Sequence, residues 1–136
     1  MGKLNLNEAA DRVQMASSEL SMYYNTETGE FDFYSEDMDM DDEVDTAKFE
    51  EAPWIPVPDR DTSERYHMMV EFVETVTDPH KNEILSVALE GKGAFRRFKD
   101  TLHRVNLIDE WYAFEHQAYV EIAREWCEEN GIEYFV

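Results

Sequence analysis

The residues best suited to chemistry are cations gathered in one short stretch. Five of the 12 Lys and Arg residues of this 136-residue chain fall within residues 92–104, which hold a single acid. Helical spacing places Arg96, Lys99 and His103 in one row, and Lys92 precedes the helix between two glycines. A guanidinium is a forked donor for phosphate or carboxylate oxygens, and a helix start favours an anion. The candidate anion-binding residues are therefore Lys92, Arg96, Arg97, Lys99 and His103.

The same cations have other interpretations. The chain carries 32 Asp and Glu residues and a formal net charge of −20, so Arg96 and Arg97 could simply pair with acids of neighbouring helices. Alternatively, the stretch binds a small phosphate-bearing ligand in an enzyme or sensor, with His103 and Asp100 as acid–base groups. Residues 91–93 lack the spacing and the following Ser or Thr of a nucleotide-binding loop, and we expect no cofactor.

A second charged segment, residues 36–45, has seven carboxylates and no cation. Self-repulsion predicts a mobile loop that could meet the basic surface of a protein partner, including by imitating nucleic-acid phosphates. The acidic partner-binding candidates are Glu36, Asp37, Asp39, Asp41, Asp42, Glu43 and Asp45. Their alternation resembles a calcium loop, but Val44 stands where that loop requires glycine, so no metal site is predicted.

The remaining reactive side chains do not form a catalytic set. Cys127 is the only cysteine, and its neighbours Glu125 and Glu128 predict a raised pKa and a poor nucleophile. The four histidines show no zinc-binding pattern. We therefore predict no catalytic residue, and the preferred interpretation is a non-enzymatic binding or regulatory protein that uses its acidic surface and its basic helix.

The elements that position these residues follow from periodicity and from turn residues. A helix is expected over residues 7–15, and alternation over 20–24 and 31–34 around an Asn-to-Gly loop predicts a β-hairpin. Residues 53–58 form a proline-rich extended connector, and helices follow from residue 62 onward. Phe95, Phe98 and Leu102 are expected to face inward. Ile132, Tyr134 and Val136 alternate and could add a third strand to the hairpin.

These elements predict one α+β domain over residues 1–136, with a small antiparallel sheet packed against a body of three to four helices. Eighteen aromatic residues favour a folded chain despite its charge. No run is apolar enough to span or enter a membrane, and the single cysteine favours a reduced, cytoplasmic compartment. A chain this acidic repels nucleic acid except through the basic helix.

Several stretches resemble one known family. The run from Glu90 to Asp100, Glu-Gly-Lys-Gly-Ala-Phe-Arg-Arg-Phe-Lys-Asp, is similar to the signature of an uncharacterised bacterial family of small acidic cytoplasmic proteins in the UPF series. The similarity extends over most of the chain, through residues 27–30, 63–72, 110–114, Trp126 and residues 131–132. The resemblance implies no activity, because none is assigned to that family.

Overall fold

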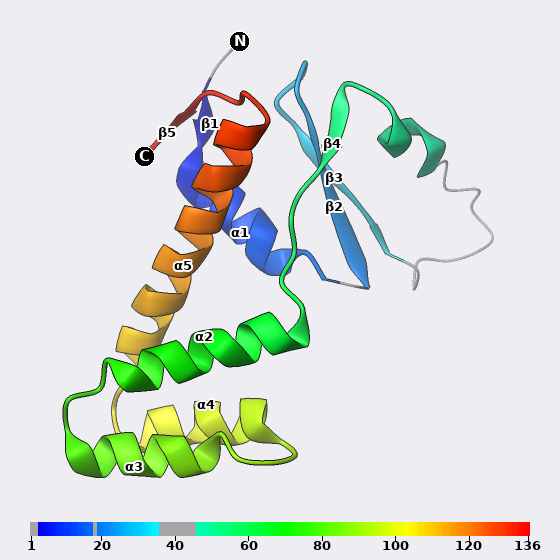
Figure 1. Cartoon of the computed structure of the whole chain (residues 1–136). Helices are drawn as coiled ribbons and strands as arrows, with labels where there is room; N and C mark the ends of the chain where they lie inside the picture. The colour runs from blue at the N-terminus through cyan, green and yellow to red at the C-terminus, as the bar shows by residue number, and fades with distance from the viewer. Residues whose placement is uncertain (1–2, 18, 36–45) are drawn as a thin grey trace. The chain divides into compact units, whose positions relative to one another are not determined.

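The computed structural model describes residues 3–17, 19–35 and 46–136. Two compact units divide the chain: residues up to 61 together with 118–136, and residues 62–117. Helices and a small antiparallel sheet are both present, so the predicted α+β class is confirmed (Figure 1). The acidic candidates from Glu36 to Asp45 lie outside the described residues. The single-domain prediction for residues 1–136 stays a prediction.

The first unit is built around the predicted hairpin. Strands β2 (Leu20–Asn25) and β3 (Phe31–Ser35) pair in antiparallel register, with Met22 opposite Phe33. The Asn25 side-chain oxygen accepts hydrogen bonds from the backbone N–H groups of Glu27 and Thr28. Gly29 closes the turn at φ +76°, a conformation that other residues rarely adopt. The turn chemistry read from the sequence therefore fixes this hairpin.

The third strand of this sheet is not the expected one. Strand β4 (Trp54–Pro56), within the proline-rich connector, pairs antiparallel with β2 and gives the order β3-β2-β4. The C-terminal strand β5 (Tyr134–Phe135) instead pairs in parallel with β1 (Leu4–Asn5). The idea that the C-terminus extends the hairpin was wrong. An edge position tolerates the missing N–H of proline, so the connector can occupy it.

Two helices contribute apolar faces to this unit. Helix α1 (Leu6–Met15) begins at Asn5, whose side chain accepts from the Asn7 and Glu8 N–H groups, and it buries Leu6 and Val13 completely. Helix α5 (Ile108–Glu129) contributes its C-terminal half. There the Trp126 ring lies 5.7 Å from the Tyr24 ring, and its Nε1 donates to the Pro56 carbonyl at 3.0 Å.

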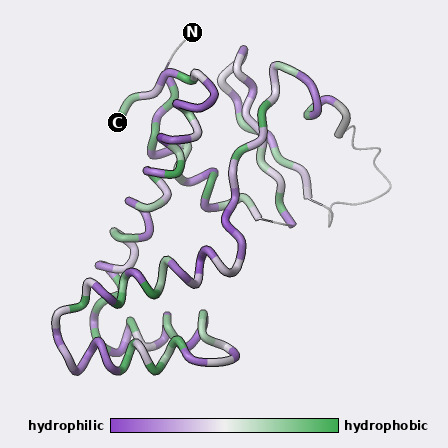
Figure 2. Tube along the Cα trace, in the orientation of Figure 1, coloured by the Kyte–Doolittle hydropathy of each residue, from purple (hydrophilic) through white to green (hydrophobic). Residues whose placement is uncertain are grey.

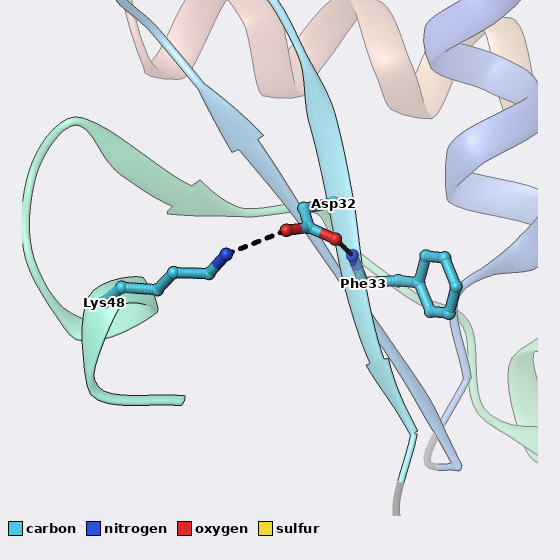
Figure 3. Close-up of polar contacts among 3 residues, drawn as sticks. All are labelled: Asp32, Phe33 and Lys48. Atoms are coloured by element: carbon cyan, nitrogen blue, oxygen red, sulfur yellow. Dashed lines mark hydrogen bonds and ion pairs between the residues drawn. The ribbon is translucent and has the colours of Figure 1, made fainter. Parts of the chain in front are cut away.

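An ion pair made by Lys48 connects the short 3-10 helix η1 (Thr46–Glu50) to the hairpin. Lys48 Nζ lies 3.0 Å from Asp32 Oδ2, and the other Asp32 oxygen accepts from the Phe33 N–H at 2.8 Å (Figure 3). The same ammonium lies 4.8 Å from the centroid of the Phe49 ring, and 5.4 Å from that of Trp54. Ion pairing and cation–π attraction therefore act on one side chain.

Replacing Lys48 with Met should lower the free energy of unfolding by about 1 kcal/mol, because both partners are partly exposed. Burial alone would raise the pKa of Asp32, but hydrogen bonds from Lys48 and Phe33 and the lysine charge hold that pKa below its ordinary value of 3.8. The contribution is thus present above pH 3.8 and lost as the pH falls further. Urea unfolding across that range checks it; because the cation–π contacts persist in acid, a wild-type advantage that does not shrink below pH 3.8 would contradict the ion pair.

The second unit is helical. It contains α2 (Thr62–Glu74), α3 (Pro79–Ala88), α4 (Ala94–Arg104) and the N-terminal half of α5. Its hydrophobic residues recur along each helix between hydrophilic ones (Figure 2). Phe72 lies at the centre of an aromatic cluster, with ring centroids 6.4 Å from Phe98 and 5.4 Å from both Trp111 and Phe114. These ring contacts place the Phe98 side of α4 in the core of this unit.

Two details of α4 differ from expectation. Phe98 and Leu102 are buried as predicted, but 42% of Phe95 is exposed, so it does not face inward. The spacing of Asn106 and Asp109 is that of a capping box and predicts Asn106 as the cap of the last helix. Asn106 instead adopts φ +59° and ends α4, where the next N–H, that of Leu107, donates to the Leu102 carbonyl at 2.9 Å. Asparagine tolerates this left-handed conformation better than most residues, which suits it to a helix end.

Candidate functional site

The candidate site begins at the turn between α3 and α4. Helix α3 starts at Asp78, whose side chain accepts from the His80 and Lys81 N–H groups, and ends at Leu89. The chain then reverses, and α4 runs back beside α3 (Figure 1). Gly93 begins α4 at φ +75° with no side-chain cap. A left-handed residue is needed here, which accounts for glycine before the basic helix.

Arg97 holds this turn together. Its Nε donates to the Ala88 carbonyl at 2.9 Å, its Nη1 donates to the Lys92 carbonyl at 2.9 Å, and its Nη2 donates to the Glu90 carbonyl. These carbonyls belong to the end of α3 and to the turn, where helical partners run out. Arg97 is therefore a half-buried cap, which neither the anion-site nor the ion-pair interpretation foresaw.

The other four anion-binding candidates point to solvent. Lys92, Arg96, Lys99 and His103 are all exposed, and we call them the cationic row. Within the described residues, none of the four forms an ion pair or a side-chain hydrogen bond. The acids of neighbouring helices therefore do not neutralise them. Within the described residues, the positively charged side chains of Lys92, just before α4, and of Arg96 and Lys99, on α4, remain available to an external anion.

A hollow of about 500 Å³ opens beside the cationic row. It is lined by Arg96, Arg97, Asp100, Thr101, Arg104 and Gly93. Arg104 Nη2 donates to Thr101 Oγ1 at 3.2 Å, and that hydroxyl donates to the Arg97 carbonyl at 2.7 Å. This chain of bonds ties the Arg104 guanidinium to the preceding turns of α4, and Arg104 lines the hollow. Helical spacing places Arg104 in one row with Arg97 and Asp100, next to the row of Arg96, and it does not single out Arg104 as a site residue.

The described parts of the chain give little support for a metal site or an acid–base pair. No group of three or more metal-ligating side chains gathers within residues 3–17, 19–35 and 46–136. His103 and Asp100 share no hydrogen bond in these ranges. In the same ranges, no helix combines the length and apolar character that crossing a membrane requires. The acidic candidates fall outside the described residues and stay predictions.

Cys127 is completely buried, and burial, together with the nearby Glu128 charge, raises the pKa of its thiol to about 11. The predicted direction is confirmed, with burial as the larger cause. Because its ordinary pKa is 9.0, the thiolate fraction alone should slow alkylation about 100-fold at neutral pH. Iodoacetamide labelling followed by mass spectrometry checks this. Equal labelling rates with and without urea would contradict a buried thiol.

Fold and site together define an α+β protein in which one helix presents a cationic face that forms no ion pair with any acid of the described residues. A family model described as "Uncharacterised protein family (UPF0158)" matches residues 4–136, and the chain belongs to this family. It is 30% identical over 73 residues to UPF0158 protein PA5073 of Pseudomonas aeruginosa. The match covers 53% of this chain and 48% of that protein, so about half of the relative's length is spanned. No solved structure matches the chain.

Proposed function

We propose that this protein is a non-enzymatic binding protein whose cationic row docks an anionic partner. The observation that carries the proposal is that Lys92, Arg96, Lys99 and His103 stay exposed and unpaired within the described residues, in a chain with 32 acids. Lys92 just before α4 and Arg96 and Lys99 on one face of it carry like charges that repel one another, and an external anion relieves that repulsion. The contribution to binding should therefore fall as salt rises.

The geometry favours a partner surface over a small phosphate-bearing ligand. Such a ligand at residues 92–97 would need the Arg97 fork, whose three nitrogens already donate to backbone carbonyls. The remaining cations spread along the exposed side of α4, which spans about 16 Å. Groups at this separation address several oxyanions of an extended or helical partner better than they surround one phosphate.

The acidic residues from Glu36 to Asp45 are proposed as a second, independent surface for a basic protein partner. Their seven carboxylates form the densest run of negative charge in the chain, which gives electrostatic complementarity to a basic face. Changing Asp37, Asp39, Asp41 and Asp42 to Asn should weaken capture of basic partners in pull-down experiments. Unchanged capture would exclude this second surface without touching the proposal for α4.

A charge-matched titration tests the cationic row. The probe is a fluorescein-labelled oligoglutamate peptide, measured by anisotropy at low salt. The Arg96→Gln, Lys99→Gln double variant should bind about tenfold more weakly than wild type, on the scale of two partly exposed charge pairs. The Lys3→Gln, Lys81→Gln variant removes the same net charge elsewhere and should bind nearly as wild type. Equal losses in both variants, or no binding by wild type, would refute a site on α4.

A further inference from the structure

A second hollow lies in the seam between α3 and α4. Its volume is about 420 Å³, and its lining includes Ile84, Val87 and Ala88 from α3 and Arg97, Thr101 and Arg104 from α4. The last three also line the hollow beside the cationic row. The two hollows therefore adjoin along α4, and we call them together the groove, with aliphatic side chains at one end and Arg96 at the other.

The α3 wall of this groove carries an exposed apolar group. Val87 is 58% exposed, which makes it the most exposed large apolar side chain within residues 62–117. Ile84 is half-buried beside it, whereas Ala88 is buried. Covering the exposed apolar area of Val87 and Ile84 with the apolar surface of a partner would be favourable. The groove is thus amphipathic, and its charge is positive along α4.

We propose that this groove binds a short acidic peptide segment that carries an aliphatic anchor residue. The anchor would cover Val87 and Ile84, and carboxylates of the segment would meet Arg104 and Arg96. This inference rests on the proposed function and specifies the chemical class of its partner. Arg96 and Arg104 are eight residues apart, so their Cα atoms are about 12 Å apart along the helix. A segment of about four extended residues, or two helical turns, spans that distance.

Chemistry favours a peptide over a nucleic acid in this groove. Unpaired bases bind by stacking on aromatic rings, and no Phe, Tyr or Trp lines either hollow, where the imidazole of His80 is the single ring. Glu83 lies on the α3 wall and Asp100 lies between Arg96 and Arg104, so a continuous phosphate backbone would meet two carboxylates. A peptide can place neutral residues at those points. An aliphatic wall also suits Leu, Ile or Val side chains.

Three labelled peptides of about 14 residues separate charge from anchoring. The first combines glutamates with leucines spaced as i and i+4, the second replaces each leucine with serine, and the third replaces each glutamate with glutamine. A labelled oligothymidylate is the fourth probe. Wild-type protein should bind the first peptide at least about tenfold more tightly than the second or third. It should bind the oligonucleotide more weakly than the first peptide.

Variants then locate the anchor. Val87→Ser should remove the preference for the leucine peptide over the serine peptide, and Val87→Leu should keep it. Val136→Ser, which truncates an 81% exposed valine in the other unit, should leave the preference unchanged. Arg104→Gln should weaken both glutamate-containing peptides.

The outcomes separate this inference from the proposed function. Equal wild-type affinity for the leucine and serine peptides, with both weakened by Arg96→Gln, Lys99→Gln, would overturn the aliphatic anchor and leave the cationic row standing. Tighter binding of the oligonucleotide than of the first peptide would overturn the peptide class. Absence of binding to all four probes would overturn both proposals.

Discussion

Replacing Arg97 with Gln is expected to lower the free energy of unfolding by about 2–3 kcal/mol. The variant loses hydrogen bonds from a guanidinium to the carbonyls of Ala88, Glu90 and Lys92. Bonds to a charged donor contribute about 1.5–3 kcal/mol each when buried, and partial exposure of this site brings the sum below the simple total. Water would solvate some of the freed carbonyls, but the turn between α3 and α4 would lose its only three-way connection among the described residues.

Arg96 provides the matched control for this measurement. It is the adjacent residue, has the same side chain and lies on the same helix, but it is exposed without a side-chain partner in the described chain. Arg96→Gln should change the free energy of unfolding by less than about 0.5 kcal/mol. Arg97→Lys keeps the charge but loses the planar fork, so it should recover less than half of the loss. Urea unfolding that gives equal values for the Gln variants would contradict the cap.

Replacing Phe72 with Ala should be the most destabilising single change, with a loss of about 3–5 kcal/mol. Phe72 is 4% exposed, and its ring lies among Phe98, Trp111 and Phe114. Truncation removes edge-to-face contacts and leaves a cavity that α2, α4 and α5 cannot all close. Because Phe98 is on the buried face of α4, the platform that presents the cationic row should loosen as well.

Urea unfolding and near-ultraviolet circular dichroism, to which Trp111 contributes, check the aromatic cluster. Phe72→Leu fills most of the volume and should lose less than about 1.5 kcal/mol. Losses below about 1.5 kcal/mol in both the Ala and the Leu variant would show that packing at this position contributes little. An unchanged near-ultraviolet signal in Phe72→Ala would also contradict the described arrangement of the rings.

The sequence was sufficient for the elements whose signals are local. Asn25 and Gly29 predict the hairpin turn, and an Asp followed by Pro, as at Asp78 and Pro79, predicts a helix start, because side-chain caps act within a few residues. Alternation also identified β5, but not its partner. Pairing across more than a hundred residues depends on which edge is free, and local periodicity contains no information about that.

For a similar reason, the sequence could not predict that Arg97 caps the turn while Arg96 stays exposed. Arg96 and Arg97 are adjacent and chemically identical in the sequence, and helical spacing only places them on neighbouring rows. Their roles diverge because α3 ends beside Arg97 and offers carbonyls to it, a tertiary relation set by the turn at Gly91 and Gly93. The exposure of Phe95 has the same origin, since packing decides which of several apolar positions the neighbouring helices cover.

One titration tests the central claim, which is that Arg97 has a structural role while the other arginines of α4 bind the partner. The Nε–H signals of ¹⁵N-labelled wild-type protein are followed by nuclear magnetic resonance while the leucine-containing glutamate peptide is added. The Arg96 and Arg104 signals should shift with peptide, and the Arg97 signal should stay in place and exchange slowly with solvent, because its Nε donates to Ala88. A shifting, rapidly exchanging Arg97 signal beside an unchanged Arg96 signal would contradict the account.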